Sequence, residues 1–141
     1  MKKTALVICI ALLAACATKP VSDQTAVQAP ADRVFAHQTP VANGATLIVS
    51  RDAGFAGSGC SVLVMIDGEK AAVLKPGERA TFNLSGPEVV LGAQATGGGI
   101  CGVAPERMRR ETSVLLPAGS KKKYRIGIGG SGEPFVSPTT L

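Results

Sequence analysis

The feature that most constrains the fold of this chain is an alternation of apolar and polar residues, interrupted repeatedly by turn-forming residues. In residues 79–85, Ala80, Phe82 and Leu84 would point to one face of a strand and the polar residues between them to the other. Asp67-Gly68 is a pair favoured in two-residue hairpin turns. Alternation with a period of two, divided by such turns, predicts β-structure.

The alternating segments predict about seven short strands. Their ranges are 46–51, 61–66, 70–74, 79–85, 88–93, 111–116 and 121–128. In the last range Tyr124, Ile126 and Ile128 would face the interior. Short strands at regular spacing predict an all-β fold, a single small antiparallel β-sandwich over residues 45–141. The glycine-rich residues 127–132 are expected to leave the last strand as a flexible exit.

The residues before this domain divide into a leader, 1–15, and a tether, 16–44. Lys2 and Lys3 precede an apolar stretch, 5–15, which is too short for a membrane-spanning helix of roughly 20 residues. The segment 16–44 is rich in Ala, Thr, Gln, Val and Pro and keeps no periodicity, which predicts a flexible tether. Fully extended, it would reach on the order of 90 Å.

The leader ends in Leu13-Ala14-Ala15-Cys16, which resembles the lipobox of bacterial lipoproteins. The resemblance implies that the Cys16 thiol takes a diacylglycerol, that residues 1–15 are removed, and that the new amine is acylated, for example with palmitate. Ala17 stands where an inner-membrane retention signal would have Asp, which favours an outer-membrane address facing the periplasm. An ordinary secretory leader with an incidental cysteine is the alternative.

The remaining cysteines form a pair. Cys9 lies in the leader and Cys16 is the lipidation candidate, which leaves Cys60 and Cys101. In an exported chain, two remaining cysteines, an even number, predict a disulfide between them. A metal pair and a reactive thiol are the alternatives, but two cysteines without a nearby His or further Cys do not make a zinc site. We therefore expect no metal.

Two patterns that could carry chemistry are better explained without it. Residues 127–132 fit the dinucleotide pattern G-x-G-x-x-G, but Pro134 follows in place of the helix that would hold a pyrophosphate. His37 is the single histidine and lies in the predicted tether, which cannot preorganise a nucleophile. The sequence therefore predicts no enzyme and no cofactor.

Positive charge gathers late in the chain. The formal net charge is +5 at pH 7, to which Lys2 and Lys3 contribute, so the mature protein is mildly basic and nucleic acid is not expected as a partner. The late basic cluster is Arg107, Arg109, Arg110, Lys121, Lys122, Lys123 and Arg125. One interpretation is a solvated strand face whose lysines protect a sheet edge. The other is a patch for an anionic envelope glycolipid or wall polymer.

The hairpin at residues 64–70 resembles the "VxIDGk" hairpin of PEGA-type modules. The resemblance continues through residues 74–78, 82–84 and 89–93. Small proteobacterial envelope lipoproteins carry such a β-sandwich behind a lipobox, with cysteine segments similar to those around Cys60 and Cys101. The resemblance implies a non-catalytic envelope module.

These features together predict a lipid-anchored, non-enzymatic structural or protein-interaction module of the cell envelope, with a protein partner there. Open sheet edges would serve such a partner by strand addition. Binding of an anionic envelope polymer through the late basic cluster is the alternative function.

Overall fold

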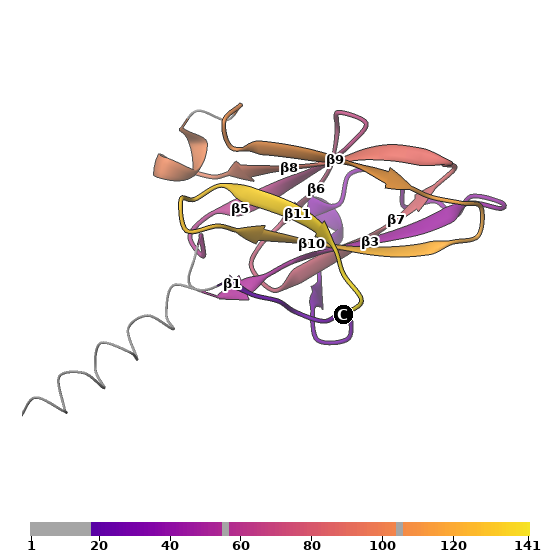
Figure 1. Cartoon of the computed structure of the whole chain (residues 1–141), viewed down its shortest axis with the longest axis horizontal. Helices are drawn as coiled ribbons and strands as arrows, with labels where there is room; N and C mark the ends of the chain where they lie inside the picture. The colour runs from indigo at the N-terminus through magenta and orange to yellow at the C-terminus, as the bar shows by residue number, and fades with distance from the viewer. Residues whose placement is uncertain (1–17, 55–56, 104–105) are drawn as a thin grey trace, which may run out of the picture.

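The computed structural model describes residues 18–54, 57–103 and 106–141 (Figure 1). In these ranges the chain forms eleven strands, two short 3-10 helices and no α-helix, which confirms the all-β prediction and exceeds the seven expected strands. Residues 1–15 and Cys16 lie outside the described residues. Among those described, none forms a helix with the length and apolar character needed to span a bilayer.

The elements follow one another with short connections. The strands are β1 (Thr18–Lys19), β2 (Val27–Gln28), β3 (Ala45–Arg51), β4 (Ala53–Gly54), β5 (Ser61–Ile66), β6 (Glu69–Leu74), β7 (Glu78–Leu84), β8 (Glu88–Thr96), β9 (Arg109–Leu115), β10 (Lys121–Ile128) and β11 (Pro134–Pro138). The 3-10 helices are η2 (Ala31–Arg33) and η3 (Gly99–Gly102).

Two larger sheets pack face to face, as the layered ribbons of Figure 1 show. One has the strand order β11-β10-β3-β7-β2 and the other β6-β5-β8-β9, while β1 pairs with β4 in a small third sheet. The core between the layers includes Leu47, Val64, Phe82, Leu91 and Ile126, all with no exposed surface. The alternation read from the sequence therefore reports correctly which side chains face inward.

The five-stranded sheet is mixed, so the prediction of an antiparallel sandwich is wrong on this point. β3 pairs in parallel with β10, and β2 in parallel with β7. Alternation shows which face of a strand is buried. It carries no information about which strand pairs with it or whether that pairing is parallel or antiparallel. A parallel pair needs a long crossover connection, and here the chain between β3 and β10 builds the whole second sheet.

The expected turn at Asp67-Gly68 is present. Both residues have positive φ, 51° and 82°, as a type I′ hairpin turn requires. The Asp67 carboxylate accepts a hydrogen bond of 2.8 Å from the backbone N–H of Val90. The Asp67 N–H in turn donates to the Val90 carbonyl at 2.9 Å. The hairpin joining β5 and β6 is therefore fastened to β8.

Residues 18–44, expected to belong to a flexible tether, instead pack on the sandwich. Along the edge of β7 the Val27 N–H donates to the Gly77 carbonyl at 3.0 Å. Further along, the Asn83 N–H donates to the His37 carbonyl at 2.8 Å. Composition could not reveal this packing, because backbone hydrogen bonds require no periodicity of side chains.

The same segment also covers the edge of β6. The Phe35 N–H donates to the Ala71 carbonyl at 2.8 Å. The Arg33 guanidinium donates to the Val73 carbonyl at 2.9 Å and to both carboxylate oxygens of Glu78 at 2.6 Å. Because Glu78 begins β7, Arg33 links the two sheets across this side of the sandwich.

The ion pair predicts a pH dependence of folding. Arg33 holds the pKa of Glu78 below its usual 4.5, so its contribution to stability is present above that value and is lost as the pH falls through the lowered pKa. We expect Glu78→Gln to lower the free energy of unfolding at pH 7 by about 1–3 kcal/mol, measured by urea denaturation. The deficit should shrink toward pH 3.

The matched control is Glu69→Gln, which removes an exposed carboxylate that has no salt bridge among the described residues. The free energy of unfolding of this variant should equal that of the parent protein at every pH. A deficit of Glu78→Gln that stays constant between pH 7 and pH 3 would contradict the assignment.

The glycine-rich segment 127–132, expected to be a flexible exit from the last strand, instead ends β10 and turns into a further strand, β11. It pairs with β10 from Tyr124 opposite Pro138 to Ile128 opposite Pro134. Because Gly127 has no side chain, the ring of Phe135 packs in the space that a Cβ atom would occupy.

A buried ion pair lies beside this packing. The Arg125 guanidinium sits 5.1 Å from the centroid of the Phe135 ring and forms a salt bridge with Asp52. The Asp52 side chain has no exposed surface, and it also accepts a 2.9 Å hydrogen bond from the Thr18 hydroxyl.

The close packing at Gly127 predicts a large cost for one methyl group. A Cβ there would collide with the Phe135 ring and lie 2.8 Å from Asp52 Oδ2. We expect Gly127→Ala to lower the free energy of unfolding by about 1–3 kcal/mol in urea denaturation, through overpacking. Gly130→Ala is the control, because a Cβ at Gly130 meets nothing within 4 Å. Equal stabilities of the two variants would count against this packing.

Candidate functional site

The two cysteines of the domain are joined. The Sγ atoms of Cys60 and Cys101 are 2.05 Å apart and the Cα atoms 5.4 Å, which confirms the expected disulfide. Cys60 precedes β5 and Cys101 belongs to η3, and the Cys60 N–H donates to the Gly57 carbonyl at 3.0 Å. The disulfide therefore fastens η3 to the loop before β5, at one end of the sandwich (Figure 1).

The disulfide predicts a marked loss of stability on its removal. The cysteines are 41 residues apart, and opening a loop of this size costs up to about 4 kcal/mol in the chain-entropy account. Replacing both by serine should lower the unfolding midpoint in urea accordingly. Alkylation of the unfolded, unreduced protein should leave both thiols unlabelled, and labelling without reductant would contradict the pairing.

The late basic cluster is not one patch. Arg109 and Arg110 begin β9, whereas Lys121, Lys122 and Lys123 begin β10, at the opposite end of the sandwich (Figure 1). Four of the cluster have a carboxylate partner: Arg109 with Glu111, Arg110 with Glu133, Lys123 with Asp23 and Arg125 with Asp52. Arg107, Lys121 and Lys122 are exposed and have no salt bridge in the described part of the chain. Much of the expected positive charge is thus neutralised locally.

The side of the sandwich opposite residues 18–44 remains open. β9 pairs only with β8, and β11 only with β10, within the described ranges. The two free edges belong to different sheets and run near each other, and we call the space between them the open seam. Unpaired strand edges of this kind are the places where another chain can add a strand.

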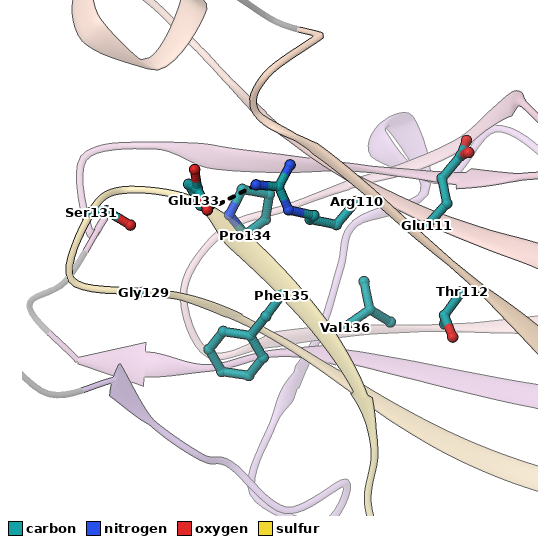
Figure 2. A pocket seen from close by; sticks show the side chains of 9 residues that line it. All are labelled: Arg110, Glu111, Thr112, Gly129, Ser131, Glu133, Pro134, Phe135 and Val136. Atoms are coloured by element: carbon teal, nitrogen blue, oxygen red, sulfur yellow. Dashed lines mark ion pairs between the residues drawn. The ribbon is translucent and has the colours of Figure 1, made fainter.

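The open seam contains a hollow of about 410 Å³ near the start of β9. Figure 2 shows Arg110 of β9 and Glu133, next to β11, pointing toward each other across it. Their ion pair measures 2.8 Å, and both side chains remain about half exposed. Thr112 and Val136 line the same hollow. An exposed pair of this type contributes little to stability and can exchange partners at low cost.

The other end of the open seam is different in character. Leu115, the last residue of β9, is 66% exposed, and nearby Val90 of β8 is 39% exposed. Leu115 and residues 121–123 line a second hollow of about 560 Å³. β9 therefore presents charge at its start and apolar surface at its end.

β9 is the more accessible of the two free edges. β11 begins and ends with proline, Pro134 and Pro138, and proline has no N–H for a ladder. β9 has seven residues and no proline. β9 therefore offers the backbone N–H and C=O groups with which a β-strand of a partner protein would pair.

The remaining sequence candidates lie in a turn and in the segment that covers β7. Residues 127–132 form the end of β10 and the turn to β11, where the Gly129 N–H donates to the Glu133 carbonyl at 2.8 Å. His37 is half-buried in the segment against β7. Within the described residues no group of three or more His, Cys, Asp or Glu side chains is placed to hold a metal ion.

Sequence reasoning missed two buried charges at the end of β3. Arg51 is 1% exposed and its Nη2 donates to the Gly57 carbonyl at 3.0 Å. Burial lowers the pKa of Arg51, an effect that the neighbouring Asp52 partly offsets. Charged residues at a strand end normally indicate exposure, so the sequence holds no signal for this burial.

Comparisons of the chain with protein-family models, curated proteins and solved structures find no match. The similarity to PEGA-type modules and to envelope lipoproteins therefore stays a prediction from the sequence.

Proposed function

We propose that this protein is a lipid-anchored, non-enzymatic protein of the cell envelope that binds a protein partner by strand addition to β9. The anchor would be Cys16, on the outer membrane, with the domain facing the periplasm. The lipobox pattern and the disulfide support this location, because disulfides persist in oxidising compartments.

The open seam is the observation that carries the proposal. Residues 18–44 supply backbone partners to the edges of β6 and β7, while β9 has none on its outer side among the described residues. An uncovered strand of seven residues is an aggregation risk unless it has a partner. The exposed Leu115 gives such a partner an apolar contact at one end of the strand.

The alternative, binding of an anionic glycolipid or wall polymer, has weaker support. Lys121 and Lys122 line the second hollow and are exposed, which favours it. Four of the seven cluster residues already have carboxylate partners, which weakens the field available to a polyanion.

The test is photo-crosslinking in intact cells, with a photoreactive residue at Ser113 on β9. The matched control position is Glu69, which is also exposed but lies on β6, the covered edge. We expect a discrete protein adduct from position 113 and none from position 69. Adding Leu115→Lys should reduce the adduct several-fold, while thermal denaturation changes little, as for most surface substitutions.

The outcomes separate the two functions. A protein adduct that forms equally at both positions would contradict the role of β9. If only glycolipid or wall fragments are recovered, and the Lys122→Glu variant no longer recovers them, the alternative function replaces the proposed one.

A further inference from the structure

The structure leaves almost no chain between the proposed lipid anchor and the folded domain. Thr18 is already paired with Gly54 in the β1-β4 sheet and hydrogen-bonded through its hydroxyl to Asp52 at 2.9 Å. Only Ala17 separates Thr18 from Cys16, so the two Cα atoms can lie no more than about 7 Å apart. With the proposed anchor at Cys16, the domain would be held directly at the bilayer, not at the distance of a long tether.

The pairing also identifies the end of the domain that the proposed anchor would turn toward the lipid. Gly54, the partner of Thr18, is three residues before Gly57, which packs so closely on Ile128 that an added Cβ would lie 2.7 Å from its Cγ1. The Cys60–Cys101 disulfide ties this loop to η3. In Figure 1 β1, the start of β5, η3 and the β10–β11 turn all lie toward the same end of the sandwich.

This end carries the most exposed large apolar side chain of the described residues. Ile100 in η3 is 82% exposed, and Val103, directly after η3, is 63% exposed. The disulfide through the adjacent Cys101 fixes their position. Ile100 also lines an apolar hollow of about 310 Å³, together with Met108 and Ile128 among others. Two exposed apolar side chains three residues apart, next to an apolar hollow, form the kind of apolar patch that marks an interaction surface.

We propose that η3 and Val103 form a membrane contact that inserts Ile100 and Val103 among the lipids. This inference rests on the proposed anchor at Cys16, because the anchor places this end, and no other, against the bilayer. Lys19 of β1 and Arg107 before β9 are exposed nearby and would meet phosphate headgroups. The acyl chains of the proposed anchor suffice for stable attachment, so the contact at η3 would mainly fix the orientation of the domain on the membrane.

The test uses tryptophan fluorescence, because the chain contains no tryptophan. Ile100→Trp in the full-length lipidated protein is placed in phosphatidylethanolamine–phosphatidylglycerol vesicles with brominated acyl chains. We expect a blue-shifted emission that loses most of its intensity to bromine quenching. Leu115→Trp is the matched control, similarly exposed but at the far end of β9, and its emission should remain unshifted and unquenched.

The outcomes distinguish the contact from the anchor. If the Ile100→Trp protein floats with the vesicles while its emission stays unquenched, the membrane contact is overturned and the anchor remains intact. A blue shift without bromine quenching also overturns the contact, since protein then covers the loop. Protein that carries no lipid by mass spectrometry and fails to float overturns both the anchor and the contact. A thermal melt equal to that of the parent protein verifies that each variant is folded.

Discussion

Every strand at the edge of a sheet presents backbone N–H and C=O groups that need partners, and the rest of this structure depends on how that need is met. On one side residues 18–44 supply the partners, through the bonds of Val27 and Phe35 to β7 and β6 and the Arg33–Glu78 ion pair. The apolar contribution of this segment is small, since its buried residues are Ala26 and Ala29. Backbone hydrogen bonds and the Arg33–Glu78 ion pair therefore decide which side of the sandwich is closed and which stays open.

Much of the strand content could be predicted from the sequence because alternation reports a physical fact, the burial of one face. The predicted ranges 61–66 and 121–128 coincide with β5 and β10, and Phe82 faces the core as expected. Asp67-Gly68 was identifiable because only residues that tolerate positive φ fit a type I′ turn. The disulfide was predictable for another reason, since Cys60 and Cys101 are the two cysteines that remain once Cys9 and Cys16 are assigned to the predicted leader and lipobox.

The partners of strands and charges could not be predicted, because they depend on contacts between distant parts of the chain. Nothing in the alternation of β3 distinguishes a parallel neighbour from an antiparallel one. The basic cluster looked like one patch because the carboxylates that divide it, Asp23 and Asp52, lie far away in sequence from Lys123 and Arg125. The segment 18–44 looked like a tether for a related reason, since its Ala- and Pro-rich composition conceals hydrogen bonds made by the backbone.

The two proposed surfaces are related by the direction of β9. The strand begins at Arg109, at the end that the anchor would place on the membrane, and ends at Leu115, at the far end of the sandwich. Its seven residues span about 23 Å, so a partner strand along β9 would extend from the bilayer surface into the periplasm. An anchor without a long tether, together with a membrane contact at η3, would fix both the height and the orientation of this edge. Binding would then cost less orientational freedom than it would for a domain on a flexible tether, because the edge is already positioned.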